Sequence, residues 1–583
     1  PPRPGGDRLR PSGPGSFRRP AILEIMVKYV STRGLAPELE FEDALLTGLA
    51  RDGGLYVPAE WPQMSERKIR ALAGVPYEEA AFRVMRPYIG ESIADADLQE
   101  MIAAAYATFR HKAVVPLTQT GANDWLLELF HGPTLAFKDV AMQILARLFD
   151  HVLAAKGRRI TVVGATSGDT GSAAIEAFKG RDTTDIFILH PKGRVSEVQR
   201  RQMTTVLDKN VHNIAIEGSF DDCQALVKAM FNDHAFRDEV SLAGVNSINW
   251  GRVMAQIVYF FTSAVALGAP SRPVAFSVPT GNFGDIFAGY AAARMGLPIA
   301  KLIVATNVND ILARTIDSGR YEVDKVVPTI SPSMDIQVSS NFERLLFDAY
   351  GRDGAAVTRL MQSLGQSGAF EIEPVRLDAI RAQFGAARVD ERETAATIKR
   401  MREETGELVD PHSAVGLAAA ARLRGDAAVP MVTLATAHPA KFPDAVKAAT
   451  GIHPELPPSM SGLFEREERL EPLPNDLGVL QAFIRERARS VAEDLHFDVP
   501  RPVDVLLDEQ RVVAERVLGF AFGALDRRRH VLGAVHPLHA LAATACAGFE
   551  QDRKPDARGF FGERRRVLRR AVLARHDGNA RGL

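Results

Sequence analysis

Lys138 lies in a mostly apolar run, residues 127–139, and is the strongest candidate for covalent chemistry in the chain. Two glycine-rich turns follow it, residues 164–172 and 279–285, each between an apolar segment and a helical one. Turns of this kind direct backbone N–H groups toward an anion. An amine and two such turns together indicate an aldehyde cofactor that the lysine holds and whose phosphate the backbone binds. A surface lysine is the simpler alternative.

The first turn, residues 164–172, follows an apolar segment and opens a helical one. Ligands of open α/β sheets bind at the carboxyl ends of the strands, where such turns lie. Gly168 and Gly171 permit positive φ angles and a close approach of the backbone. The glycine spacing does not match a dinucleotide fingerprint, and the P-loop lysine is missing. The candidate ligand-binding residues of this turn are Ser167, Gly168, Asp169 and Thr170.

The second turn follows the apolar segment 274–278 and precedes a helical stretch at 286–294. The N–H groups at the start of such a helix favour a bound anion. Taken alone, either turn is equally typical of a tight structural connection, and only the combination with Lys138 favours a cofactor site. The candidate phosphate-binding residues are Gly281, Asn282, Phe283, Gly284 and Asp285.

Thr436 directly follows the last apolar run, residues 431–435. A hydroxyl group there can hydrogen-bond a neutral ring nitrogen, whereas a carboxylate would hold that nitrogen protonated. Two polar runs, residues 191–196 and 331–343, carry cations, hydroxyls and amides suited to phosphate or carboxylate oxygens. Solvated loops explain both runs equally well. Residues 410–413 precede a helical stretch and are interpreted as its cap.

The bulk composition excludes several classes of function. The chain has 583 residues, 46% hydrophobic content and a net charge of −1, so we expect several domains and no attraction to nucleic acid or an anionic membrane. The two cysteines, Cys223 and Cys546, fit no disulfide scaffold or metal-ligand spacing, and a reducing cytoplasm is expected. The apolar run 257–269 is shorter than the roughly 20 residues of a membrane span and predicts a buried helix.

Short apolar runs alternate with helical stretches from about residue 112 to 445. This alternation predicts an α/β class with at least one doubly wound parallel sheet. Residues 26–110 are predicted to be mostly helical. The predicted strands are residues 160–163, 186–189, 213–216, 274–278, 302–305 and 431–435, with helices at 172–178 and 223–231.

Both ends of the chain differ from its middle. Residues 1–25 are rich in Pro, Gly and Arg and are interpreted as a disordered extension without function, with a transit peptide as the alternative. Residues 490–583 form an Arg-rich basic tail, in which residues 508–522 and 536–547 could be amphipathic helices. A read-through or frame-shifted, non-native end and an RNA-binding tail are the alternatives that remain open.

Six short motifs form a familiar set: residues 29–34, 50–58, 131–139, 166–171, 281–285 and 436–442. The chain, from about residue 26 to about 489, resembles the threonine synthase family, in the branch with an added N-terminal domain. The resemblance implies pyridoxal 5'-phosphate as cofactor. It also implies fold type II, like the tryptophan synthase β chain, with two doubly wound parallel-sheet subdomains. The implied domains are 26–111, mostly helical, and 112–489, catalytic with a family C-terminal segment.

The resemblance also implies roles for the candidate residues. Lys138 binds the cofactor aldehyde, residues 281–285 hold its phosphate, and Thr436 faces its ring nitrogen. Residues 167–170 line its hydroxyl side, and Ser167 and Thr170 grip the substrate carboxylate. A second anion site must receive the leaving phosphate; the candidates are Lys192, Arg194 and Asn341.

The implied reaction converts O-phospho-L-homoserine and water to L-threonine and phosphate, by γ-elimination and β-addition of water. We expect a cytoplasmic monomer or homodimer without nucleic-acid or membrane partners. Three alternatives stay open: a threonine-synthase-like phospholyase that releases 2-oxobutyrate, an amino-acid dehydratase of the same fold type, and a non-catalytic protein that binds the cofactor.

Overall fold

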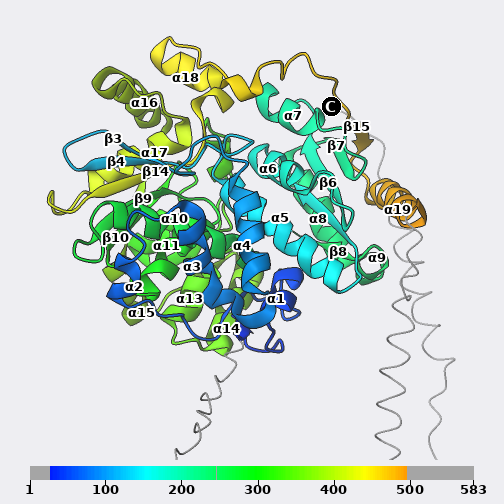
Figure 1. Cartoon of the computed structure of the whole chain (residues 1–583), viewed down its shortest axis with the longest axis horizontal. Helices are drawn as coiled ribbons and strands as arrows, with labels where there is room; N and C mark the ends of the chain where they lie inside the picture. The colour runs from blue at the N-terminus through cyan, green and yellow to red at the C-terminus, as the bar shows by residue number, and fades with distance from the viewer. Residues whose placement is uncertain (1–26, 245, 495–583) are drawn as a thin grey trace, which may run out of the picture. The chain divides into compact units, whose positions relative to one another are not determined.

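The computed structural model describes residues 27–244 and 246–494 (Figure 1). The extension 1–25 and the helices predicted at 508–522 and 536–547 lie outside the described residues. Within them, two sheets of parallel strands carry the architecture, and helices cover the sheet faces.

The larger sheet has six strands in the order β13-β10-β9-β14-β4-β3. All neighbours are parallel except β3 and β4, which form an antiparallel pair at one edge. The strands are β3 (Leu117–Gln119), β4 (Asp124–Glu128), β9 (Val274–Pro279), β10 (Ile299–Thr306), β13 (Phe384–Arg388) and β14 (Met431–Ala435).

The second sheet has five strands in the order β15-β7-β6-β5-β8, and every neighbouring pair is parallel. All eight residues of β6 are buried, as expected for a strand covered on both faces. The strands are β5 (Ile160–Ala165), β6 (Thr184–Pro191), β7 (Val211–Glu217), β8 (Leu242–Ala243) and β15 (Glu471–Pro474).

All six predicted strands are confirmed, and so is the α/β class with two parallel-sheet subdomains. The helices that follow the N-terminal region are α5 (Lys138–Ala155), α6 (Asp169–Phe178), α7 (Glu197–Thr204), α8 (Phe220–Asn232), α9 (His234–Glu239), α10 (Trp250–Ala266), α11 (Gly284–Arg294), α12 (Ile311–Ser318), α13 (Phe342–Ala349), α14 (Gly354–Ser367), α15 (Pro374–Gln383), α16 (Glu391–Thr405), α17 (Pro411–Leu423), α18 (Pro443–Thr450) and α19 (Leu477–Asp494). A separate antiparallel pair joins β11 (Arg320–Glu322) to β12 (Ala369–Glu371).

The N-terminal region is mostly helical, as predicted, but it begins with a short antiparallel pair. Strands β1 (Tyr29–Ser31) and β2 (Tyr56–Pro58) form this pair. The helices are α1 (Phe41–Thr47), α2 (Glu66–Arg70), α3 (Tyr77–Ile89) and α4 (Asp95–Tyr106). Buried side chains of this region share one apolar core with α5 and α10, and the boundary placed at residue 111 stays a prediction.

Helix α10 is the buried helix predicted from the apolar run 257–269, but its bounds differ. It begins at Trp250, where the side chain of Asn249 caps it, and ends at Ala266. Arg252 and Gln256 of its first turns are buried with the apolar residues, although their polarity hid this from the sequence pattern. In the described part of the chain, no helix is long and apolar enough to cross a membrane. Helix α10 packs on α5 and α11 and so supports the elements that carry the candidate site.

Candidate active site

Lys138 is the first residue of α5, at the carboxyl edge of the six-stranded sheet. The loop before it is fastened to the end of β14, because Phe137 N donates to Thr436 O at 2.8 Å. An isolated bridge between Ala136 and Ala437 adds a second link. The lysine side chain is almost completely buried. The fold therefore withdraws this amine from water and fixes its position.

Asp169 reaches Lys138 from the other sheet. It is the first residue of α6, which follows β5, and one of its oxygens, Oδ2, lies 3.5 Å from Nζ of Lys138. Gly168 precedes it with a φ of 139°, a conformation that side-chain-bearing residues rarely adopt. The carboxyl ends of the two sheets thus meet at this pair, where ligands of α/β proteins bind.

Ser333 completes the immediate surroundings of the lysine amine. Its Oγ lies 3.4 Å from Nζ of Lys138 and donates to Oδ2 of Asp169 at 3.2 Å. Its backbone N donates to Nε2 of His412 at 3.2 Å, and Nδ1 of His412 lies 2.8 Å from Oδ1 of Asp410. Because Nε2 accepts a hydrogen bond, the proton of this imidazole is on Nδ1 and faces Asp410.

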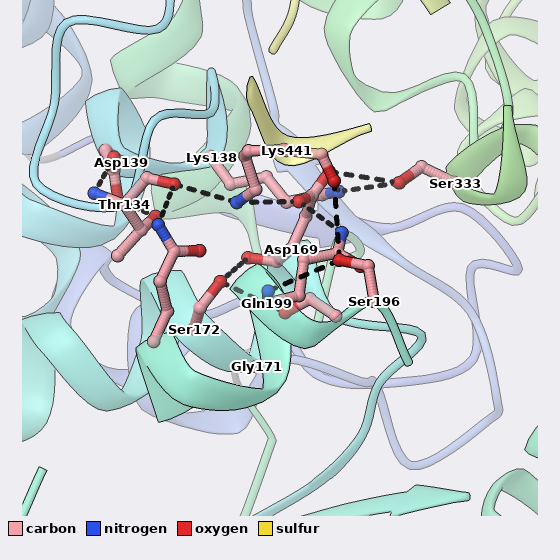
Figure 2. Close-up of polar contacts among 12 residues, drawn as sticks. Thr134, Lys138, Asp139, Asp169, Gly171, Ser172, Ser196, Gln199, Ser333 and Lys441 are labelled. Atoms are coloured by element: carbon pink, nitrogen blue, oxygen red, sulfur yellow. Dashed lines mark hydrogen bonds and ion pairs between the residues drawn. The ribbon is translucent and has the colours of Figure 1, made fainter. Parts of the chain in front are cut away.

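The other oxygen of Asp169, Oδ1, has two further donors. Nζ of Lys441 lies 2.8 Å from it, and Nε2 of Gln199 donates to it at 2.8 Å. Lys441 also donates to the carbonyl of Thr134 at 2.7 Å, in the loop that leads to Lys138. Figure 2 shows these side chains gathered around Asp169. The carboxylate is therefore the centre of a buried network of two lysines, a serine and a glutamine.

Burial and charge set the protonation of this network. Burial lowers the pKa of Lys138 to about 8; Asp169 opposes this effect, while Lys441 and Arg252 add to it. Burial acts to raise the pKa of Asp169, but the charges of Lys441 and Lys138 outweigh it and hold that pKa well below its usual range. A carboxylate thus stays ionised beside an amine that can lose its proton near neutral pH.

The loop at residues 281–285 has the shape of an anion cradle. A Cβ on Gly281 would lie 3.0 Å from the carbonyl oxygen of Ser333, so no larger side chain fits there without displacement. Phe283 has a left-handed φ of 62° and is the N-cap of α11, a helix whose first N–H groups have no partner within it. Since Ser333 touches both Gly281 and Lys138, the cradle and the amine belong to one site. These residues fit a cofactor that has an aldehyde and a phosphate.

The remaining residues of this loop are also placed by the structure. The backbone carbonyl of Asn282 accepts from Asn341, and Gly284 and Asp285 form the first turn of α11. The carboxylate of Asp285 accepts a hydrogen bond from Tyr259, and burial raises its pKa to about 7, with this bond opposing the shift. Asp285 is therefore suited to offer its backbone, rather than its side chain, to an anion.

The hydroxyl groups predicted to meet ligands lie around the same network. Thr436 is buried directly after β14, and Ser167 and Thr170 are half-buried on either side of the turn into α6. Within residues 27–244 and 246–494, the structure records no hydrogen bond for these three side chains. They are available to a ligand, and their predicted roles remain predictions.

The three candidates for a second anion site are not part of this network in the described chain. Lys192 forms an exposed ion pair with Glu217 at 3.2 Å, and Arg194 is exposed. Asn341 is buried, and its side chain donates to carbonyls of Ser247 and Asn282. Its position beside the cradle gives it a supporting contact with the loop instead.

Two residues of the network, His412 and Lys441, received no catalytic or binding role from the sequence. Ser333 lies in the polar run 331–343, and Gln199 follows the run 191–196, both of which were predicted to suit phosphate or carboxylate oxygens. Lys441 lies in the motif 436–442, and its apolar neighbours in sequence were the available signal. The cap predicted at residues 410–413 is confirmed, since Asp410 accepts from the backbone of His412 and Ser413. The same aspartate also orients the imidazole that holds Ser333.

The structure also contains a cavity of about 310 Å³, whose lining does not include Lys138. Apolar side chains such as Leu55, Phe342 and Met361 line most of it. Ser339 belongs to its wall and donates to the carbonyl of Gly281 at 2.7 Å. The cavity and the cradle therefore share one segment of chain, but no residue of the Lys138 network lines the cavity.

Three family models match consecutive parts of the chain. Residues 28–106 match the threonine synthase N terminus, residues 110–360 match pyridoxal-phosphate dependent enzymes, and residues 413–484 match the threonine synthase C-terminal segment. Lys138, Asp169 and the cradle all fall within the second match. Fold and site thus define a pyridoxal-phosphate-dependent enzyme of fold type II.

Relatives and solved structures narrow the class. A threonine synthase from Pseudomonas aeruginosa is 58% identical over 461 residues, which cover 79% of this chain and 98% of that protein. The crystal structure of PLP-bound threonine synthase from Brucella melitensis has 62% identity and a TM-score of 0.78, covering 79% of this chain and all of that one. The crystal structure of threonine synthase from yeast has 42% identity and a TM-score of 0.76, covering 79% of this chain and 99% of that one. The chain belongs to the threonine synthase family.

Proposed function

We propose that this protein converts O-phospho-L-homoserine and water to L-threonine and inorganic phosphate, the last step of threonine biosynthesis. One observation carries the proposal: a buried lysine amine contacts an ionised aspartate and a serine that also borders a glycine cradle. The family to which the chain belongs supplies the reaction. The enzyme is accordingly a lyase that depends on pyridoxal phosphate.

The site residues are assigned from their positions. Lys138 would hold the cofactor aldehyde, and residues 281–285 would hold its phosphate through backbone N–H groups. Thr436, whose hydroxyl group has no recorded partner among the described residues, lies at the end of β14 and would meet the ring nitrogen. Ser167 and Thr170 would bind the substrate carboxylate, with Gly168 and Asp169 completing that side of the site.

Pyridoxal phosphate, when bound, withdraws electrons from the amino-acid substrate and makes its α and then β hydrogens acidic. The chain must supply a base that can reach both carbons. Lys138 is suited to this role, because its pKa of about 8 leaves a useful fraction of the amine unprotonated near neutral pH. Ser333 and Asp169 fix the direction of its Nζ. Phosphate leaves from the γ carbon, which then takes up a proton to become the methyl group, and water adds at the β carbon.

A site for the leaving phosphate is still required. Lys192 and Arg194 lie between β6 and α7, in the connection that also leads to Ser196 and Gln199 at the network. We retain both as candidates, since a cation in that connection can pair with a dianion. Asn341 would contribute indirectly, because its side chain donates to the backbone carbonyl of Asn282 in the loop 281–285. Lys192→Ala or Arg194→Ala should then raise KM for the phosphorylated substrate more than it lowers kcat.

Turnover of the loaded enzyme tests the proposal. With O-phospho-L-homoserine, phosphate and threonine should form in equal amounts, whereas Lys138→Ala should form neither while keeping the circular-dichroism spectrum of the parent. Lys399→Ala is the matched control, because Lys399 is an exposed residue of α16 that forms an ion pair with Glu403. Threonine formation by Lys138→Ala would contradict the assignment of the lysine.

Location and assembly are part of the proposal. Two cysteines far apart in sequence, with Cys223 buried and unpaired, favour a reducing cytoplasm. We expect a monomer or a homodimer. Cell fractionation and light scattering on the purified protein would decide both points.

A further inference from the structure

Lys441 is a buried lysine that the proposed reaction does not use. Its side chain is completely buried, and its Nζ lies 2.8 Å from Oδ1 of Asp169 and donates to Thr134 O at 2.7 Å. Burying an ammonium group costs several kcal/mol unless a close counter-charge compensates it. Asp169 is that counter-charge, and Lys138 lies on its other oxygen, 3.5 Å away.

The network therefore contains two lysines and one carboxylate. Asp169 can neutralise only one of the two ammonium groups, and the shorter contact and the additional carbonyl acceptor are on the side of Lys441. If Lys441 and Asp169 form a neutral pair, a proton on Lys138 would be a buried charge without a counter-ion of its own. Deprotonation of Lys138 then leaves the network electrically neutral.

We propose that Lys441 is a positioning residue that occupies Asp169 and thereby keeps the amine of Lys138 free for the cofactor aldehyde. Without Lys441, both oxygens of Asp169 would be available to Lys138, and an ion pair would hold its proton. The inference rests on the proposed role of Lys138 as the amine that holds the cofactor.

The charged groups that face this network favour the same outcome. Lys441 comes from the turn Pro439–Lys441 after β14, and Arg252 from α10; both lower the pKa of Lys138. Asp169 from α6 raises it. The other titratable groups nearby are His412 from α17, whose Nε2 accepts from Ser333, and Asp139 from α5, whose pKa burial raises while the charge of Lys441 opposes that shift. Gln199 from α7 is uncharged and fixes Oδ1 of Asp169 on the side of Lys441. Asp169 opposes deprotonation of Lys138, and Lys441 is the cation from these elements that directly contacts Asp169.

The test measures the pH midpoint of Lys138 reactivity in the full chain without cofactor. Cyanate reacts with unprotonated amines, and peptide mass spectrometry reports its addition to Lys138 alone. In Lys441→Met the midpoint should rise by about one unit or more, because a cation is lost and Asp169 is released. Capture of added pyridoxal phosphate at pH 7 should slow by about tenfold and recover at pH 9.

Two controls accompany this variant. Lys441→Arg keeps the charge, and its midpoint should stay within about 0.3 units of the parent. Arg159→Met disturbs another largely buried carboxylate, Asp185, at the start of β6, and should leave the Lys138 midpoint unchanged. An unchanged midpoint in folded Lys441→Met would overturn the proposal.

Two further outcomes distinguish a folding defect in the Lys441 variants from a failure of the proposed function. If Lys441→Met does not fold, Lys441→Gln replaces it; failure of both while Lys441→Arg folds would assign the residue to folding and overturn the proposal. If the parent protein captures no pyridoxal phosphate, the proposed function fails. The cyanate midpoint still decides the role of Lys441 in that case, because the measurement needs no cofactor.

Discussion

Ser333 touches Lys138 through its side chain, with Oγ 3.4 Å from Nζ. Its backbone carbonyl lies 3.0 Å from the position of a Cβ on Gly281, in the loop proposed to hold the cofactor phosphate. Ser333 therefore lies between the Lys138 amine and the loop at Gly281, the two groups that a cofactor with an aldehyde and a phosphate would connect. Changes on either side of Ser333 should alter cofactor binding before they alter the fold.

Gly281→Ala tests this spacing. The new methyl group would displace the Ser333 carbonyl by a few tenths of an ångström, so the dissociation constant for pyridoxal phosphate should rise by about tenfold. Fluorescence titration of the cofactor-free protein measures it. Gly425→Ala is the control, because a Cβ at that loop position meets no other atom within 4 Å. Equal affinity in the two variants would contradict the proposed cradle.

Asp410→Asn should disturb Ser333 through His412. An amide cannot accept from both Nδ1 of His412 and the Ser413 hydroxyl, so the imidazole should lose its orientation and kcat/KM should fall by about ten- to a hundredfold. Asparagine still caps a helix well, so stability should change by no more than about 1–2 kcal/mol. Kinetics and thermal unfolding are the measurements. Asp390→Asn, the same change at the cap of α16, should keep full activity.

Asp285 should make stability depend on pH in the cofactor-free protein. Its pKa is raised by burial to about 7, above the value near 4 of an unfolded chain, so the folded state binds more protons between these pH values. Stability contributed by this group should therefore fall as pH rises from about 4 to about 7, by at most about 1.4 kcal/mol per unit. Asp285→Asn should remove that slope in urea unfolding. A stability difference between parent and variant that is constant with pH would contradict the assignment.

Deletion of the chain ends should distinguish the family segment from the flanking sequence. Helix α19 continues to Asp494, with Leu480 and Ile484 completely buried, so the cut belongs after residue 494. Without residues 1–25 and 495–583, threonine formation should stay within about twofold. Deletion from Leu477 onward should lower the free energy of unfolding by several kcal/mol, because two buried side chains are lost. A large loss of activity in the shorter deletion would overturn the view that the ends are dispensable.

The hydrophobic pattern of the sequence predicted the six strands and the α/β class correctly. The β-branched runs at Ile160, Ile186 and Met431 are strands because buried parallel strands are apolar on both faces, and such runs stand out in sequence. The apolar run in α10 predicted a helix, but its bounds were shifted toward its C-terminus. Arg252 and Gln256 are buried there, and a polar residue in sequence gives no sign of being buried.

The site was only partly predictable, for a physical reason. Lys138 and Asp169 belong to motifs that can be recognised locally in the sequence, as an amine in an apolar run and a glycine turn after a strand. Lys441 and Ser333 act through contacts with residues 272 and 164 positions away, and only the meeting of the two sheets brings them together. Lys192 was chosen by its charge alone, and exposed cations are common in loops.

The most direct test of the account is product analysis of the purified protein with pyridoxal phosphate and O-phospho-L-homoserine. Threonine, 2-oxobutyrate and phosphate are measured in the same reaction. The account predicts threonine as the dominant organic product, equal in amount to phosphate. Dominant 2-oxobutyrate would contradict it, and would keep Lys138 and the cofactor but make the protein a phospholyase; neither product would show that the assigned substrate is wrong.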